Sequence, residues 1–379
     1  MSAAPILPLF ERYPALRRLP RVSFGDFPTP VERVTDLRNV QPGCSVHDSR
    51  ANDLAGELWI KRDDLSSATI GGNKVRALEF LLAGIGPGHE VMTIGATGST
   101  HALATAFYAH ALGARTTIVR WDQEMNPDAV AVSACTERAA DLSISARTAA
   151  GAYLRAGVRR LLARGGRGGA TSARLHWVPA GGTSMRGMLG HVNAALELAR
   201  QVEQGEMPAP ARVFVPLGSG GTAAGLLLGF AIAGLDSNVV AVRVVPRLVG
   251  NVPHVRTLAV RCARYIAALT GERVPRPGHG RIRVEHRAYG GAYGRATAGG
   301  TDAARRLRDW RGIPLDATYS AKALAAALAA DTWTDSGGGS AAGTREVSTR
   351  PRLFWLTFDA RYLTASANVA GIVNAGGIE

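Results

Sequence analysis

The stretch RVFVPLGSGGTAAGLLLGFAIAGL, residues 212–235, indicates how this chain folds. Its apolar first part is typical of a β-strand, glycines and small polar residues then form a loop, and the apolar run after them predicts a helix. A strand that leads through a glycine loop into a helix belongs to a βα unit, and such units build parallel sheets covered by helices. Ligands usually bind such sheets at the loops that leave the carboxyl ends of the strands.

The same alternation begins near residue 57. Short apolar or β-branched runs predict strands, and longer runs with helical periodicity predict helices. We therefore expect an α/β protein with mostly parallel sheets and helices on both faces. The predicted strands are 57–64, 90–96, 115–121, 141–147, 174–182, 212–217 and 238–245, and the predicted helices are 73–84, 99–113, 126–140, 149–165, 185–204 and 221–235.

Size and composition narrow the class of protein. The 379 residues can form one large or two medium domains, and 46% hydrophobic with 20% charged residues is an ordinary globular balance. No apolar run reaches the roughly 18 residues of a membrane-spanning helix, and the N-terminus lacks a signal-peptide pattern. Cys44, Cys135 and Cys262 are far apart and odd in number, which predicts neither a disulfide framework nor a zinc site. We expect a cytoplasmic protein without a metal.

The chain is basic, with a net charge of +14, and only three of its 44 basic residues are lysines: Lys61, Lys74 and Lys322. A basic protein can bind nucleic acid or another polyanion. Here the arginines are scattered, without interleaved aromatic residues or the signature of a nucleic-acid-binding module. We therefore expect no specific nucleic-acid partner, and a basic binding protein is kept only as an alternative to an enzyme.

The glycine loop at residues 218–222 is a candidate phosphate site. Glycines let the backbone approach an anion closely, and the following helix N-terminus favours negative charge. Ser219 and Thr222 add two hydroxyl groups. The loop lacks the Gly-Lys-Ser/Thr of a P-loop, and Ala223 stands where Gly-x-Gly-x-x-Gly needs its last glycine. The alternative is a tight turn that binds nothing.

Lys74 is a candidate nucleophile. It follows Gly71, Gly72 and Asn73 at the start of a predicted helix, where a cation opposes the helix dipole. Partial burial there would lower its pKa and favour the neutral amine. A lysine amine can form a Schiff base and a guanidinium cannot, which explains a lysine in an arginine-rich chain. The alternative is an ordinary solvated surface lysine.

A third candidate is Ser99-Thr100-His101, which follows a predicted strand and opens a helix. The hydroxyl groups and free helix N–H groups could hold a substrate carboxylate. The alternative role for Ser99 is that of a helix N-cap. The spacing from His101 to His110 matches no zinc pattern.

Together these motifs resemble the family of pyridoxal 5'-phosphate (PLP) enzymes that contains D-cysteine desulfhydrase and 1-aminocyclopropane-1-carboxylate (ACC) deaminase, which have the type II, tryptophan-synthase-β-like fold. Seven blocks occur in the family order over about residues 27 to 330. They are FPTPVERV, LWIKRDDL, GGNKVRALEFLL, GSTHALATA, VPAGGTSMRGMLGHVNAALEL, PLGSGGTAAGLLLG and GIPLDATYSAKALAAAL.

The resemblance implies roles for residues in the matched blocks. Lys74 corresponds to the Schiff-base lysine and acts as the general base once released. Tyr319, in DATYSAK, and Tyr293, in AYG, correspond to substrate-side tyrosines, and Ser99 is a further catalytic candidate. The other implied contacts are Ser99, Thr100 and His101 to the substrate, and Asn73, Thr100, Gly218, Ser219, Gly220, Gly221, Thr222, Ser320 and Thr357 to the cofactor.

The resemblance also implies two three-layer αβα domains. The larger is formed by residues 1–83 and 184–379, the smaller by residues 84–183, and PLP lies in the cleft between them. The family is usually homodimeric, so we expect a homodimer here.

The implied reaction is removal of the α-proton of a small amino acid and β-elimination to a keto acid and ammonia. Family deaminases tend to carry Glu after the substrate-side tyrosine and Leu in the late strand, whereas this chain has Ser320 and Thr357. A carboxylate beside the ring nitrogen makes PLP a stronger electron sink, and a hydroxyl leaves that nitrogen neutral. We therefore favour an activity like that of D-cysteine desulfhydrase, with ACC deaminase as the alternative.

Three positions depart from the family pattern. Thr100 replaces an asparagine that contacts the PLP ring oxygen, and Phe358 and Asp359 replace two glycines that let the backbone pass the cofactor. A Gly/Ser-rich insert, residues 331–349, precedes that strand. A diverged PLP-binding protein with little turnover is therefore a further alternative.

Overall fold

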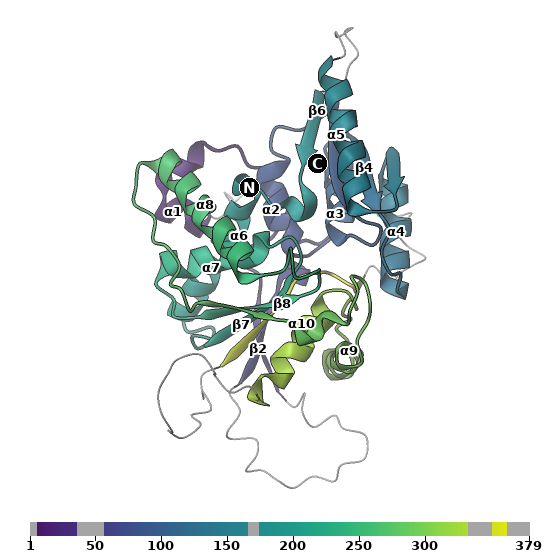
Figure 1. Ribbon diagram of the computed structural model, residues 1–379. Helices are drawn as coiled ribbons and strands as arrows, with labels where there is room; N and C mark the ends of the chain where they lie inside the picture. The colour runs from purple at the N-terminus through teal and green to yellow at the C-terminus, as the bar shows by residue number, and fades with distance from the viewer. Residues whose placement is uncertain (1–5, 36–56, 166–173, 333–350, 362–379) are drawn as a thin grey trace.

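The computed structural model describes residues 6–35, 57–165, 174–332 and 351–361, so Cys44 and nearly all of the Gly/Ser-rich insert lie outside the described residues. Its strands form one six-stranded and one four-stranded sheet, each covered by helices (Figure 1). Within the described ranges, no helix is both long and apolar enough to cross a lipid bilayer.

The six-stranded sheet places the last strand of the described residues at its centre. β10 (Arg352–Leu356) lies between β2 (Leu58–Arg62) and β7 (Arg212–Leu217), and Phe354 pairs with both Ile60 and Phe214. Every residue of β10 is buried, as expected for a central strand of a parallel sheet. The full order is β1 (Val31–Val34), β2, β10, β7, β8 (Asn238–Arg243) and β9 (Ile282–Glu285), and β1 is antiparallel to β2.

Helices cover both faces of this sheet because alternate strand residues point to opposite sides. Val213 packs in a core cluster with residues of α6 (Met185–Glu203), α7 (Gly221–Ala233) and α8 (Val252–Thr270). Phe214, the next residue, packs against α9 (Ala298–Arg311) and α10 (Ser320–Leu328) on the other face. The two groups of helices lie on opposite sides of β7 and β8 in Figure 1.

The four-stranded sheet takes all its strands from residues 89–178 and is parallel throughout. Met92 and Val119 pack with Ala152 and Ala156 of α5, whereas Val91 and Ile118 pack in clusters that contain residues of α3 and α4. The elements are β3 (His89–Ala96), β4 (Arg115–Trp121), β5 (Leu142–Ala146), β6 (Arg174–Val178), α3 (Thr100–Ala111), α4 (Pro127–Ala139) and α5 (Ala149–Gly165).

The strands and helices predicted from the sequence are confirmed, with ends that differ by a few residues. Residues 57–64 were expected to be one strand, but Asp63 and Asp64 turn into a short 3-10 helix after β2. The prediction missed α1 (Pro8–Arg12), β1, α8, β9, α9 and α10, which lie outside the alternating stretch.

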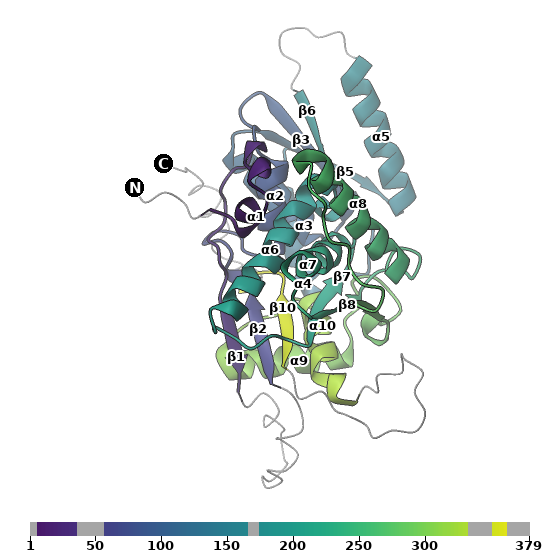
Figure 2. The same ribbon diagram turned by 90° about the vertical axis from the view of Figure 1, so that its left-hand side faces the viewer.

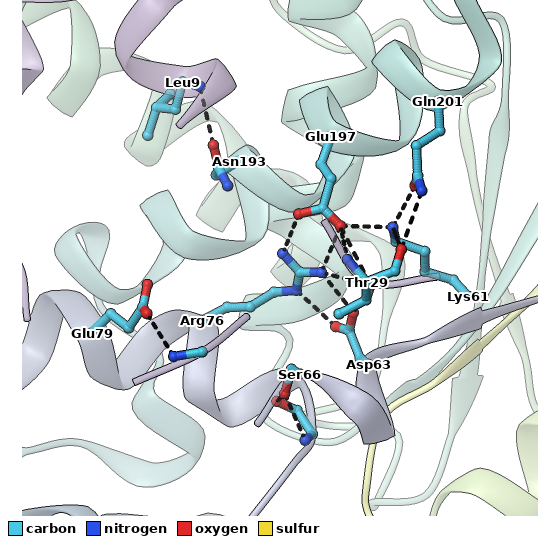
Figure 3. Close-up of polar contacts among 12 residues, drawn as sticks. Leu9, Thr29, Lys61, Asp63, Ser66, Arg76, Glu79, Asn193, Glu197 and Gln201 are labelled. Atoms are coloured by element: carbon cyan, nitrogen blue, oxygen red, sulfur yellow. Dashed lines mark hydrogen bonds and ion pairs between the residues drawn. The ribbon is translucent and has the colours of Figure 1, made fainter. Parts of the chain in front are cut away.

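A buried polar cluster, defined by Lys61, Asp63, Arg76 and Glu197, holds α2 (Asn73–Leu81) between β2 and α6 (Figure 3). The Arg76 guanidinium donates to Asp63 at 2.7 and 2.9 Å and to Glu197 at 2.8 and 3.0 Å. Lys61 Nζ donates to Glu197 Oε1 at 2.6 Å. Because Arg76 lies two residues after Lys74, the cluster fixes the helix that carries the candidate nucleophile.

Candidate active site

A cavity of about 610 Å³ lies at the carboxyl ends of strands from both sheets. Gly221 and Ser320 do not line it, although each adjoins a residue that does. The cavity brings together the following residues that the sequence singled out: Asn73, Lys74, Ser99, Thr100, His101, Gly218, Ser219, Gly220, Thr222, Tyr293, Tyr319 and Thr357.

Lys74 lies in the first turn of α2 and lines this cavity. Its Nζ donates to the carbonyl oxygen of Gly181 at 3.4 Å. Burial lowers the pKa of Lys74 to about 8. A substantial fraction of the amine is therefore neutral near physiological pH, as a nucleophile or general base requires.

The start of α2 requires a glycine. Gly72 has φ of 126°, and a Cβ there would lie 2.7 Å from the carbonyl oxygen of Thr357. Gly72 also forms an isolated antiparallel bridge with Phe358. The end of β10 therefore passes close to the residue that precedes Asn73 and Lys74.

The glycine loop connects β7 to α7 and faces the cavity. A Cβ on Gly218 would point into open space, with Tyr319 Cε1 at 3.9 Å as the nearest contact. Gly220 has φ of 92°, a left-handed conformation that favours glycine. The N-terminus of the 13-residue helix α7 follows at Gly221. An open backbone cradle at a helix N-terminus fits a phosphate group.

Hydroxyl groups surround this cradle. Thr183 Oγ1 donates to Ser219 Oγ at 2.7 Å, and Asn73 Nδ2 donates to Thr222 Oγ1 at 2.8 Å. His254 Nε2 lies 3.1 Å from the carbonyl oxygen of Ser219. The loop is therefore fixed by side chains from three other segments, which exceeds what a simple turn needs.

Ser99 and Thr100 lie where β3 leads into α3. Ser99 Oγ accepts from the Ala102 N–H at 3.3 Å, so Ser99 is the N-cap of α3. His101 is buried and its Nε2 lies 3.0 Å from Thr93 Oγ1. Burial lowers the pKa of His101 to about 3, so its ring is neutral and adds no positive charge beside a carboxylate.

Tyr293 and Tyr319 meet at one end of the cavity, where their hydroxyl groups are in contact. Burial raises the pKa of Tyr293 to about 12 and that of Tyr319 well above its ordinary value. Both hydroxyls therefore keep their protons. Asp316 positions Tyr319 by accepting its backbone N–H at 2.6 Å.

Ser320 and Thr357 form a hydroxyl pair, with 3.4 Å between Ser320 Oγ and Thr357 Oγ1. Thr357 lines the cavity, whereas Ser320 is fully buried behind it. The carbonyl oxygen of Thr357 accepts the Asn73 N–H at 2.9 Å, which ties β10 to the start of α2.

The two bulky residues after Thr357 have different surroundings. Phe358 lines the cavity and packs in the core cluster beside α2 and α3. Asp359 lies outside the cavity and accepts from Arg361 Nε at 2.7 Å. Gly72 on the facing segment provides the clearance that the Thr357 carbonyl oxygen requires.

Several cavity residues were not recognised from the sequence. Trp121 ends β4 and Tyr153 lies near the start of α5, and their rings stack with centroids 6.3 Å apart. Val249 and Leu258, from the segment after β8, also line the cavity. The position of Trp121 at the carboxyl end of a predicted strand was the available signal.

Comparisons with known proteins identify the family to which this chain belongs. The sequence profile of the family described as pyridoxal-phosphate dependent enzyme matches residues 23–339. The chain is 35% identical to the nocardicin C-9' epimerase of Nocardia uniformis over 70% of this chain and 80% of that protein. It is 30% identical to the D-cysteine desulfhydrase of Salmonella typhimurium over 82% of this chain and 88% of that protein. It is also 30% identical to a putative ACC deaminase of Pyrococcus horikoshii, over 82% of this chain and 86% of that protein.

Solved structures share the fold. An ACC deaminase homologue has a TM-score of 0.70 at 23% identity and covers 98% of this chain and 100% of its own. The processed form of threonine deaminase isoform 2 from Solanum lycopersicum has a TM-score of 0.54 at 15% identity, with 96% of this chain and 88% of its own covered. These neighbours confirm the α/β, type II PLP-dependent fold. The family match and the relatives show that this chain belongs to the pyridoxal-phosphate dependent enzymes.

Proposed function

We propose that the protein is a PLP-dependent lyase, like D-cysteine desulfhydrase, that eliminates a β-substituent from an amino acid. One observation carries the proposal: a lysine with a lowered pKa and an open glycine cradle line the same cavity. A relative 30% identical to this chain is named D-cysteine desulfhydrase.

The residues present fit the cofactor. The open backbone at Gly218 and the hydroxyls of Ser219 and Thr222 would hold the phosphate, and the Lys74 amine would bind the aldehyde carbon. When bound, PLP supplies an electron sink for negative charge at the substrate α-carbon. Thr357, paired with Ser320, would face the ring of the cofactor.

The chain's own groups supply the remaining functions. Ser99, Thr100 and the N–H groups that open α3 bind the substrate carboxylate. Lys74 Nζ, with its lowered pKa, takes the α-proton. The protonated hydroxyls of Tyr293 and Tyr319 can donate hydrogen bonds on the substrate side.

The hydroxyl pair favours a desulfhydrase over an ACC deaminase. Ser320 Oγ lies 3.4 Å from Thr357 Oγ1, and no carboxylate is among the described cavity residues. A hydroxyl leaves the ring nitrogen of the cofactor neutral, and expulsion of a thiolate needs a weaker electron sink than opening a cyclopropane ring. The alternatives are an ACC deaminase and a PLP-binding protein with little turnover.

A side-by-side assay tests the proposal. PLP-loaded protein is given D-cysteine, L-cysteine or ACC, and keto acid, ammonia and sulfide are measured. Release of keto acid and sulfide from cysteine faster than keto acid from ACC supports the desulfhydrase. Faster release from ACC supports the deaminase. A bound cofactor with inversion of the α-carbon and no keto acid would replace the lyase by an epimerase, and no reaction at all would favour the binding protein.

We also propose that residues 1–83 with 184–379 form the larger domain, that residues 84–183 form the smaller one, and that the protein is a cytoplasmic homodimer. Each sheet draws its strands from one of these two units, which supports the division. An exposed apolar stripe on α5 supports self-association: Leu154, Val158, Leu161 and Leu162.

A further inference from the structure

The cavity has an apolar wall, defined by Trp121, Tyr153, Val249 and Leu258, that the proposed lyase chemistry does not use. Trp121 and Tyr153 stack with an interplanar angle of 26°. Tyr153 is 50% exposed and Val249 is 42% exposed, although both line the cavity. Large apolar side chains left exposed at a cavity mark a surface that a ligand covers.

The wall lies beside the groups proposed to hold the substrate on one side and the cofactor phosphate on the other. The Trp121 carbonyl oxygen accepts the N–H and the hydroxyl of Thr97 at 2.9 and 3.0 Å, two residues before Ser99. On the other side, Leu258 would meet a Cβ on Gly220 at 3.1 Å, so it packs on the glycine loop. Figure 2 shows α5 and α8 on the same side of the molecule, in the right-hand part of the view.

The charges around the cavity indicate which kind of substrate side chain fits there. Among the described residues that line the cavity, the charged or titratable nitrogen groups are Lys74, His101 and His254, and none is Asp, Glu or Arg. A substrate side chain with its own charge would have no counter-ion at the apolar wall and would lose its hydration. A cysteine side chain is neutral but too short to cover two aromatic rings and two aliphatic residues.

We propose that the substrate is an S-substituted cysteine whose sulfur carries an aromatic or branched apolar group, and that this group packs on the apolar wall. The inference rests on the proposed lyase for its bond-breaking step. The α-proton leaves, the Cβ–S bond breaks, and the sulfur departs with the bonding electrons and takes a proton. With one water, the remaining three-carbon unit yields pyruvate and ammonium, so no oxidant or reductant is required.

The first test compares substrates on the PLP-loaded enzyme. Cysteine, S-methylcysteine, S-phenylcysteine and S-benzylcysteine, each as D and L isomers, are assayed for pyruvate and thiol. Burial of the aromatic ring predicts a kcat/KM for S-benzylcysteine roughly 10- to 100-fold above that for S-methylcysteine, because both expel alkyl thiolates and differ mainly in apolar area. Equal or higher kcat/KM for cysteine would overturn the inference, because it would show that the wall does not bind a group carried by the sulfur.

Two variants test the wall itself. Tyr153→Ala should lower the ratio of kcat/KM for S-phenylcysteine to that for cysteine by about 10-fold. Trp121→Phe should lower this ratio by a smaller factor. It is the variant to measure if Tyr153→Ala misfolds. Leu248→Ala is the matched control, because Leu248 is 90% exposed, next to Val249, and outside the cavity. An unchanged ratio in Tyr153→Ala would contradict the proposed contact.

A binding experiment separates failure of the inference from failure of the lyase proposal. The cofactor absorbance is titrated with S-phenylcysteine, phenylalanine, cysteine and alanine. If no amino acid yields pyruvate, the lyase proposal fails. Tighter binding of the two aromatic ligands, weakened by Tyr153→Ala, would still support an aromatic-binding wall. Equal dissociation constants for all four would overturn it.

Discussion

The three lysines of this arginine-rich chain have different surroundings. Lys61 is fully buried and paired with Glu197. Lys322 is buried and its Nζ donates to the carbonyl oxygen of Tyr289 at 3.1 Å. Of the three, only Lys74 lines the cavity. Lys61 and Lys322 therefore satisfy internal oxygen atoms, and Lys74 is the one placed to react with a bound molecule.

We predict that borohydride reduction of the PLP-loaded protein fixes the cofactor to the peptide that contains Lys74. Lys74→Arg keeps the positive charge but cannot form the reducible bond, so this variant should lose both the label and the cofactor absorbance band. Peptide mass spectrometry locates the label. Labelling at Lys61 or Lys322 in the unaltered protein would show that the assignment is wrong.

The lowered pKa of Lys74 predicts a pH dependence. Burial brings its pKa to about 8, so the neutral, nucleophilic fraction of the amine rises as the pH increases through about 8 and falls below it. Attachment of PLP to the apo-protein, followed by absorbance in stopped flow, should accelerate over that range. A midpoint near the ordinary lysine pKa of about 10.4 would mean that the amine is solvated instead.

At the level of elements, the β7–α7 loop offers a test in which the fold is preserved. A methyl group on Gly218 would meet no atom nearer than 3.9 Å, so Gly218→Ala should fold normally but fill the cradle proposed for the phosphate. We expect the PLP affinity of the apo-protein to fall at least about 10-fold, as one lost charge-assisted hydrogen bond implies.

The control is Gly157→Ala on α5, where a Cβ would meet nothing within 4 Å and the residue does not line the cavity. It should leave PLP affinity unchanged. Gly220→Ala is less informative, because its φ of 92° would strain any alanine and its Cβ would meet His254 and Leu258 at 3.1 Å. Unaltered affinity in Gly218→Ala would mean that the loop is only a turn.

The buried polar cluster predicts how α2 and α6 depend on each other. Burial would raise the pKa of Glu197, but Arg76 and Lys61 beside it lower that pKa to about 2. Glu197→Gln leaves both cations without a full partner and should reduce the free energy of unfolding by about 3–5 kcal/mol at pH 7 in urea titrations. Glu272→Gln, in an exposed pair with Arg12, should change it by at most about 1 kcal/mol.

The same cluster sets a pH window. Because the folded-state pKa of Glu197 lies below its unfolded value of about 4.3, its contribution to stability is present above that value. It is lost as the pH falls towards about 2. The Glu197→Gln variant should therefore show a shallower loss of stability between these pH values, and an identical slope would contradict the lowered pKa.

At the scale of the whole molecule, the exposed stripe on α5 predicts self-association. Leu154 and Leu161 are each 70% exposed and lie two turns apart on one face of the helix. Light scattering should give about twice the 39.7 kDa chain mass, and Leu161→Glu should shift the protein towards monomer. Leu248→Glu, which changes an exposed leucine elsewhere, should leave the mass unchanged. A monomer at micromolar concentration would contradict the homodimer.

The sequence by itself determined the fold class, the cofactor through the family resemblance, and a minority of the residues that line the cavity. Alternating strands and helices leave distinct periodic patterns, and a glycine loop or a lysine after Gly-Gly-Asn depends on local backbone requirements that are visible in the chain. The type II fold and the PLP family are confirmed, and the roles of Lys74, Ser99 and Tyr319 remain predictions.

Only the tertiary structure decided how distant segments meet. It placed β10 between β2 and β7, turned Asp359 away from the cavity, and assigned the close backbone approach to Gly72. It also brought Tyr153 against Trp121, 32 positions earlier in the chain. Such contacts depend on which strand edges pair and which side chains pack across an interface, and neither leaves a period or a spacing in the sequence.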